Sequence, residues 1–241
     1  MRLDKLLSNN GFGSRKEVKA LISGGHVRLN GEIAKKPNLQ VKPEQDQVEV
    51  DGQKVVHEEF VYWMLNKPKG VISATEDSYH STVLDCLALE DYRPDLFPVG
   101  RLDIDTTGLL LLTNDGKLAH RLTSPKHRVA KRYYAEIKGI VTEKTIEAFT
   151  QGLDLGDFIT QSAELDIEEV KLDQDMSRIT VQIYEGKFHQ VKRMFEACDL
   201  RVMELHRYRM GPIELDSDME CGDYRRLSEI ELERLKPFGL S

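Results

Sequence analysis

The sequence predicts an α+β protein made of a small N-terminal module and a larger, strand-rich domain. Helical spacings and turn dipeptides crowd into roughly the first sixty residues, whereas the rest carries many strand-like apolar runs and few long helices. A length of 241 residues is ample for a sizeable core and allows one large domain or two smaller ones. We place the boundary so that residues 1–59 form the module and residues 60–241 form the domain.

Two short helices are predicted at the N-terminus. Leu3, Leu6 and Leu7 recur at helical spacing, so they define the first helix. The second helix begins after Ser14, because Ser14 and Glu17 have the spacing of a capping box. Together with small strands they would make a compact unit of roughly sixty residues, near the lower size limit for independent folding.

Turn dipeptides then organise the strands of the module. Gly24-Gly25 can end the second helix with a left-handed residue. Asn30-Gly31 stands between two short strand-like segments, which is a strong hairpin signal. Asp51-Gly52 follows another such segment and predicts a further turn. The module should therefore contain two helices and a few short strands.

Charge is distributed unevenly along the chain. The total of −7 argues against a nucleic-acid partner, because binding phosphates requires positive charge. However, three segments are basic. Residues 1–42 hold nine basic and three acidic residues, and residues 117–138 hold seven basic residues and one acidic residue. Residues 187–211 hold six basic and three acidic residues. Acidic residues dominate 43–61 and 141–180. If folding gathers the basic blocks on one face, that face attracts phosphates; the alternative is chance clustering of solvated charges.

Several classes of protein are excluded by what the sequence lacks. Apolar runs such as Leu109–Leu112 are far too short to cross a bilayer, and the N-terminus shows no secretory signal core. Cys86, Cys198 and Cys221 are too scattered for a disulfide framework or a CxxC ligand pair. The histidines lack HxxxH or HExxH spacing, and no GxGxxG or Walker loop is present. We therefore expect a cytoplasmic protein without a metal or cofactor.

A polar loop bounded by Gly100 and Gly108 lies between two apolar strand-like runs. It contains two carboxylates, Asp103 and Asp105, two threonine hydroxyls and Arg101. Such a rigidly placed loop is a candidate active-site loop. The alternative is a turn whose aspartates and threonines bond their own backbone. Spacing alone does not decide between the two carboxylates.

Two further segments place chemically useful side chains beside apolar faces. In the predicted strand 131–138, alternation puts Tyr133 on the apolar face, where its ring can either stack on a base or serve as core. Residues 189–198 have the spacing of an amphipathic helix, with Lys192 beside its apolar stripe. Lys192 can pair with a buried carboxylate or, more simply, with Glu196 one turn later.

Two resemblances to known families add to these patterns. The segment MRLDKLLSNNGFGSRKEVKALISGGHVRLNGEIAKKP resembles the S-four-type RNA-binding module. The motifs NKPKG, GRLDIDTTGLLLLTNDG, KRYYAEIKG and EGKFHQVKRMF resemble, in order, those of RNA pseudouridine synthases, and most closely the RsuA-like ribosomal family. This resemblance implies a mixed, largely antiparallel sheet. It also implies that Asp103 is the catalytic aspartate, Tyr133 the family's tyrosine and Lys192 its basic partner.

The implied activity is the isomerisation of one uridine to pseudouridine in ribosomal RNA, most closely the small-subunit (16S) RNA. The bond from the sugar to the uracil nitrogen is cleaved, and the uracil turns and rejoins through its carbon five, without metal or cofactor. An ionised Asp103 can attack the anomeric carbon or remove the neighbouring sugar proton, and a basic neighbour such as Lys192 favours its ionised form. Alternatives are a large-subunit (23S) enzyme, a non-catalytic ribosome-assembly protein and, remotely, a glycosidase using Asp103 and Asp105.

The expected partner is ribosomal RNA, free or in an assembly particle, bound by a monomer away from any membrane. The target base must leave its stack while basic side chains hold the flanking phosphates. Arg101 can also fill the space that the base vacates. The candidate RNA contacts are the basic residues Arg2, Lys5, Arg15, Lys16, Lys19, Lys67, Arg101, Lys131, Lys187 and Arg193.

Overall fold

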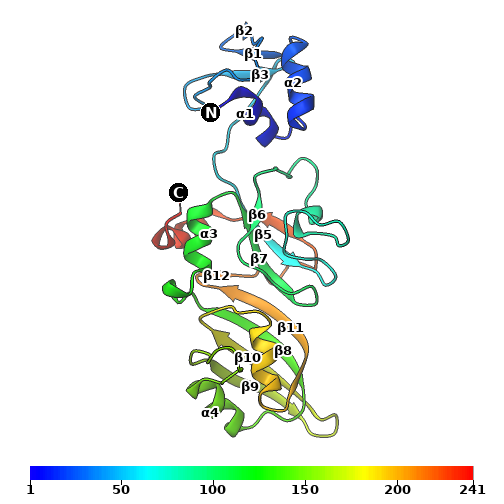
Figure 1. The fold of residues 1–241 in the computed structure, drawn as a ribbon, viewed down its shortest axis with the longest axis vertical. Coiled ribbons are helices and arrows are strands. Elements are labelled where there is room, and N and C mark those ends of the chain that lie inside the picture. Colours follow the sequence, from blue (N-terminus) through cyan, green and yellow to red (C-terminus); the bar gives the residue numbers. More distant parts are fainter. Residues whose placement is uncertain (241) are drawn as a thin grey trace. The chain divides into compact units, whose positions relative to one another are not determined.

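The computed structural model describes residues 1–240, which form two compact units (Figure 1). The first unit comprises Met1–Val61 together with Leu87–Leu96, and the second comprises Tyr62–Cys86 and the chain from Phe97 onward. The segment Leu87–Leu96 groups with the first unit partly because the Arg93 guanidinium donates a hydrogen bond to the Glu58 carbonyl at 2.7 Å. The predicted boundary after residue 59 lies close to the end of the first segment of this unit, but it does not include Leu87–Leu96.

The first unit packs two helices against a four-stranded antiparallel sheet in the order β2-β1-β3-β4. Its core consists of apolar side chains from both helices and from the strands, among them Leu3, Leu7, Val18, Ile22 and Val27. The elements are α1 (Leu3–Asn9), α2 (Arg15–Ser23), β1 (Val27–Leu29), β2 (Glu32–Ile33), β3 (Val48–Val50) and β4 (Gln53–Lys54).

The local signals of this unit act as predicted. Ser14 caps α2 in a reciprocal capping box with Glu17. Asn30 and Asp51 adopt left-handed φ values of 52° and 50°, and each precedes a glycine at the tip of a hairpin. These turns fix the register of the exposed outer strands β2 and β4 against β1 and β3.

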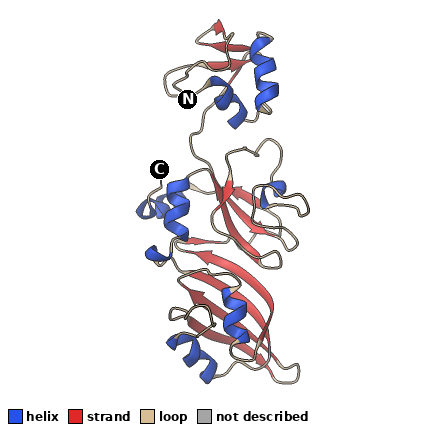
Figure 2. Ribbon diagram, viewed as in Figure 1, coloured by secondary structure: helices blue, strands red, loops and turns tan. Residues whose placement is uncertain are grey.

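The second unit is built on one nine-stranded sheet, which Figure 2 shows as a continuous curved surface. Its main path is β13-β5-β7-β11-β8-β10-β9, with β6 added to β7 and β12 to β11. Among the strands described for this sheet, only the β7–β11 pair is parallel, so the mixed, largely antiparallel sheet is confirmed. The strands are β5 (Tyr62–Lys67), β6 (Phe97–Pro98), β7 (Thr107–Thr113), β8 (Lys131–Lys138), β9 (Glu164–Lys171), β10 (Met176–Ile183), β11 (Arg201–Met210), β12 (Ile213–Glu214) and β13 (Tyr224–Arg226).

Short helices flank this sheet. The predicted amphipathic helix is present and contacts β11. No helix within residues 1–240 is both long and apolar enough to cross a membrane. The helices are η1 (Val83–Cys86), α3 (Gly116–Thr123), η2 (Pro125–His127), α4 (Glu143–Gln151), α5 (Gln190–Glu196), α6 (Glu229–Leu235) and η3 (Lys236–Phe238).

The parallel β7–β11 contact depends on the absence of a side chain at Gly108. A Cβ at this position would lie 2.2 Å from the Arg207 carbonyl oxygen, and Gly108 has a φ of 103° that other residues rarely adopt. His206 pairs with Thr107 and Arg207 with Gly108 across this contact. The close approach therefore holds the loop before β7 beside β11.

Strand β8 is buried on one face and partly exposed on the other. Tyr133, Ala135 and Ile137 are buried, and they share the sheet with buried Val181 and Ile183 of the neighbouring β10. The predicted placement of Tyr133 on the apolar face is confirmed. The strand thus directs the tyrosine ring inward beside the loop that precedes β7.

Candidate active site

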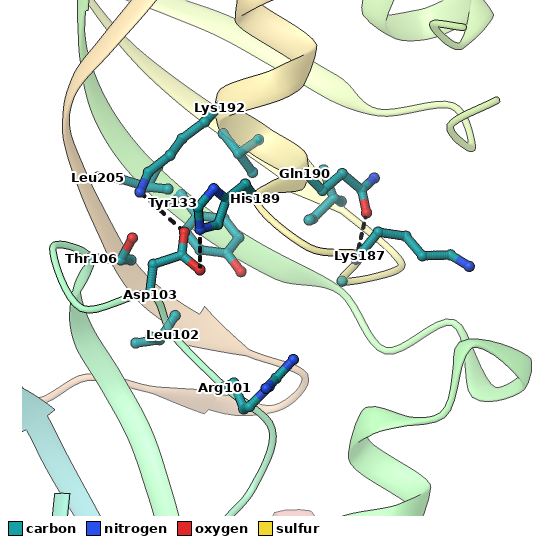
Figure 3. Close-up of a pocket in the computed structure, with 13 residues that line it drawn as sticks. Arg101, Leu102, Asp103, Thr106, Tyr133, Lys187, His189, Gln190, Lys192 and Leu205 are labelled. Carbon is teal, nitrogen blue, oxygen red and sulfur yellow. Dashed lines mark hydrogen bonds and ion pairs between the residues drawn. The ribbon is translucent and has the colours of Figure 1, made fainter. Parts of the chain in front are cut away.

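A cavity of about 60 Å³ opens where the loop before β7 faces β8, β11 and the start of α5 (Figure 3). A single water needs about 10–15 Å³, so the cavity has room for more than one solvent-sized group. One side is apolar and the other carries a carboxylate and cations. The lining residues are Arg101, Leu102, Asp103, Thr106, Tyr133, Ile183, Gly186, Lys187, His189, Gln190, Val191, Lys192 and Leu205.

The Asp103 carboxylate lies between two nitrogen-bearing side chains from the start of α5. Lys192 Nζ is 3.1 Å from Oδ2, and His189 Nε2 is 3.6 Å from Oδ1 (Figure 3). The Asp103 side chain is 28% exposed, so it is shielded yet can still be reached from the cavity. A carboxylate held this way keeps its negative charge close to any group that enters.

The structure distinguishes the carboxylates of Asp103 and Asp105, between which the sequence alone could not choose the one that faces a site. Asp105 also pairs with Lys192, at 2.6 Å from Nζ, but its side chain is 62% exposed and does not line the cavity. Burial raises the pKa of Asp105, but the hydrogen bond from Lys192 together with the nearby positive charges lowers it further, and the net pKa lies below its usual value. Only Asp103 therefore presents its carboxylate to the cavity.

Lys192 is held by these two carboxylates and not by Glu196. Burial lowers the pKa of the Lys192 ammonium, but hydrogen bonds to Asp105 and Asp103 outweigh that effect and raise the net pKa. Its side chain is only 17% exposed, so the ammonium is shielded from bulk water. The simpler interpretation, a surface pair with Glu196, does not describe this lysine.

Hydrogen bonds from distant segments fix the loop that carries Asp103. The Ser73 hydroxyl accepts from the Leu102 amide at 3.0 Å and donates to the Leu102 carbonyl at 2.9 Å. Lys67 Nζ donates to the Thr106 carbonyl at 2.9 Å, and the Gly70 amide donates to the Ile104 carbonyl at 2.8 Å. The loop is therefore anchored on both sides of Asp103, which holds the carboxylate in place before any ligand arrives.

Two of the predicted RNA contacts are corrected by the structure. Lys67 is 0% exposed and donates to the Pro68 and Thr106 carbonyls, and Lys131 is 6% exposed and donates to the Val129 carbonyl. Burial lowers the pKa of each lysine to about 8. Neither ammonium can reach a phosphate, and Lys67 instead holds the Thr106 carbonyl of the loop that carries Asp103.

The low pKa of Lys131 predicts a pH-dependent effect of Lys131→Met on stability. Between pH 8 and 10.5 the folded wild type loses this proton while the unfolded chain keeps it. Wild-type stability relative to the variant should therefore rise over this range, by up to about 3 kcal/mol. Urea unfolding at several pH values measures the difference. The exposed Lys138→Met on the same strand should show no such trend, and a pH-independent difference for Lys131→Met would contradict the assignment.

The remaining predicted RNA contacts are mostly accessible. Arg101 and Lys187 are exposed at the cavity, and Figure 3 shows the Lys187 side chain pointing away from Asp103. Arg193 is ion-paired with Asp157 and donates to the Leu155 carbonyl at 2.8 Å, so it is less free to bind phosphate. In the first unit the exposed members are Arg2, Lys5, Arg15, Lys16 and Lys19, of which Arg2 pairs with Asp4.

Three side chains important to this site were not found by sequence reasoning. Ser73 stands outside the recognised motifs, and only the folded loop shows its contact with Leu102. His189 and Gln190 lie within the EGKFHQVKRMF motif, only two or three positions before Lys192. This closeness in sequence could have indicated that they belong to the same site. Within residues 1–240, no three His, Cys, Asp or Glu side chains cluster as a metal site would require.

Comparisons with known proteins agree with this geometry. Residues 61–197 match the family model described as RNA pseudouridylate synthase, and residues 1–48 match the S4 domain. The chain is 47% identical to the uncharacterized RNA pseudouridine synthase YtzG of Bacillus subtilis, over 98% of each chain. It is 40% identical to ribosomal small subunit pseudouridine synthase A of Escherichia coli, over 96% of this chain and 98% of the relative.

Two further matches complete the comparison. Ribosomal large subunit pseudouridine synthase B of Bacillus subtilis is 37% identical, over 98% of this chain and 95% of the relative. A crystal structure of a pseudouridylate synthase, 37% identical, superposes with a TM-score of 0.67 over 98% of this chain and 99% of that one. The family model alone covers more than half of the chain, including the loop with Asp103 and the helix with Lys192. The chain belongs to the RNA pseudouridine synthase family.

Proposed function

We propose that this chain isomerises a uridine of small-subunit ribosomal RNA to pseudouridine, with Asp103 as its catalytic residue. The observation that carries the proposal is the carboxylate of Asp103, which faces the cavity while Lys192 Nζ lies 3.1 Å from one of its oxygens. The ammonium balances the negative charge of the carboxylate, and both routes of the reaction use a carboxylate oxygen at this position. Binding alone would need no such shielded pair.

The other side chains of the cavity suit a flipped-out pyrimidine nucleotide. In the proposed complex the uracil lies against Tyr133, Leu205 and neighbouring apolar groups, and the sugar faces Asp103. Asp103 either attacks the anomeric carbon or removes the adjacent sugar proton, and the freed uracil then turns within the cavity. The apolar walls let the ring rotate without binding it to one orientation.

The choice of the small subunit rests on relatives. Several of the similar proteins are named small-subunit enzymes, and the Escherichia coli one is 40% identical, against 37% for the large-subunit enzyme. The S4 domain and the exposed Arg101 and Lys187 supply positive charge for the RNA backbone. The second candidate function is the same isomerisation in large-subunit ribosomal RNA.

Tritium release from RNA labelled at carbon five of uridine tests this proposal. Forming pseudouridine replaces the hydrogen at that carbon, so the purified chain should release tritium from small-subunit ribosomal RNA and leave large-subunit RNA largely unreacted. Release from large-subunit RNA alone would overturn the substrate. Tight RNA binding without release from either RNA would support a non-catalytic assembly protein instead.

A further inference from the structure

An exposed aromatic pair stands at the mouth of the candidate active site. Phe188 is 69% exposed, and its ring stacks on that of His189, with centroids 3.8 Å apart and an interplanar angle of 17°. His189 lines the cavity, and its Nε2 lies 3.6 Å from Asp103 Oδ1. The His189 ring therefore lies beside the Asp103 carboxylate, and the Phe188 ring stacked on it is exposed to solvent.

The loop that presents these rings is held firmly. The buried Gln190 side chain accepts a hydrogen bond from the Lys187 amide at 3.0 Å and donates one to Glu185 Oε1 at 2.8 Å. Glu185 in turn accepts from the Gln161 amide at 2.9 Å. His189 has a left-handed φ of 49°, a conformation that persists where surrounding contacts fix the backbone. Phe188 is thus exposed by a defined loop structure.

The surroundings of Phe188 favour a nucleobase as its occupant. His189 covers one face of the phenyl ring, and the large exposed fraction leaves room for a flat group on the other. Lys187, the preceding residue, is exposed at the cavity and can hold a phosphate. Aromatic rings stack on unpaired bases in RNA recognition, whereas a protein partner would need a larger apolar patch.

We propose that Phe188 and His189 form a stacking subsite for a base adjacent to the target uridine in the RNA. Extruding the target leaves the faces of its neighbours uncovered, and this platform would cover one of them. The inference rests on the proposed function and adds a contact beyond the reacting nucleotide. It assigns no chemical step to either ring.

Two substitutions separate stacking from simple apolar contact. Phe188→Leu keeps an apolar side chain but removes the flat ring, whereas Phe188→Tyr keeps the ring. On a ribosomal RNA fragment that the wild type modifies, Phe188→Leu should raise KM about tenfold with kcat little changed, and Phe188→Tyr should behave like the wild type.

RNA fragments that lack one base identify the contact directly. Removing the base on the 5′ or on the 3′ side of the target should weaken wild-type binding about tenfold at one of the two positions. The same removal should have no further effect on Phe188→Leu, because the stacking partner is already absent. Equal losses for both proteins at both positions, or a wild-type KM for Phe188→Leu, would overturn the inference.

The outcomes distinguish this inference from the proposed function. If the wild type forms no pseudouridine in any ribosomal RNA, the proposed function fails. If the wild type is active and Phe188→Leu matches it on intact and base-deleted RNA, only the stacking subsite fails. Loss of binding to a ribosomal protein with unchanged RNA kinetics would also overturn the subsite and assign Phe188 to a protein contact.

Discussion

Replacing Asp103 with asparagine is expected to reduce pseudouridine formation by about 10⁴-fold or more. The amide keeps nearly the same shape, but it can neither attack the anomeric carbon nor accept the sugar proton. RNA binding should remain nearly unchanged, because the exposed basic side chains proposed to contact RNA lie elsewhere. Single-turnover tritium release and equilibrium RNA binding measure the two effects separately.

Asp105→Asn is the matched control for this prediction. Asp105 sits two residues away, pairs with the same lysine and is outside the cavity, so its loss should cost far less activity. Lys192 would still face Asp103. Comparable turnover by Asp103→Asn and the wild type, or equal inactivation by the two variants, would contradict the assignment of the catalytic carboxylate.

Gly108→Ala is expected to destabilise the second unit severely, by about 4 kcal/mol or more. The added Cβ would lie 2.2 Å from the backbone oxygen of Arg207, and a backbone cannot move aside as a flexible side chain does. The positive φ of Gly108 adds to the cost. The β7–β11 contact must separate, so activity should fall together with the free energy of unfolding measured in urea.

Gly116→Ala provides the control for Gly108→Ala. Gly116 is the first residue of α3, it has no positive φ, and a Cβ there meets nothing within 4 Å. Alanine is the better helix former, so this variant should be as stable as the wild type or slightly more stable. A Gly108→Ala protein that unfolds at the wild-type urea concentration would show that the two strands do not require the close approach.

Local features of this fold could be predicted from the sequence because neighbouring residues determine them. The capping box at Ser14 and the turn at Asn30-Gly31 depend only on residues a few positions apart. The alternation that buries Tyr133 is a property of a single strand. The end of β5 (Tyr62–Lys67) is not such a local feature, because pairing with β7 extends the strand through the polar Asn66 and Lys67.

Features that depend on distant partners were not predictable in this way. Lys67 has the composition of a phosphate contact, yet pairing of β5 with β7 buries it beneath the Thr106 carbonyl. Nothing local to Ser73 indicates its bonds to Leu102, 29 positions later. The choice between Asp103 and Asp105 also required the fold, because only the path of the loop decides which carboxylate faces the cavity.

The distribution of charge gave better guidance than its total. The net charge of −7 suggested no affinity for nucleic acid, but the basic blocks coincide with the S4 domain and with the segments that carry Tyr133 and Lys192. Of the candidate RNA contacts in those blocks, Lys131 is buried in the fold and Lys187 is exposed. Charge patterning therefore pointed to segments that line the candidate site, whereas burial shows which of their basic side chains are exposed.

Mapping pseudouridines in ribosomal RNA, with and without the gene for this chain, tests the central claim most directly. Deleting the gene should remove pseudouridine from one position of the small-subunit RNA. The wild-type chain should restore that position, and the Asp103→Asn chain should not. An unchanged map, or a loss confined to the large-subunit RNA, would contradict the account.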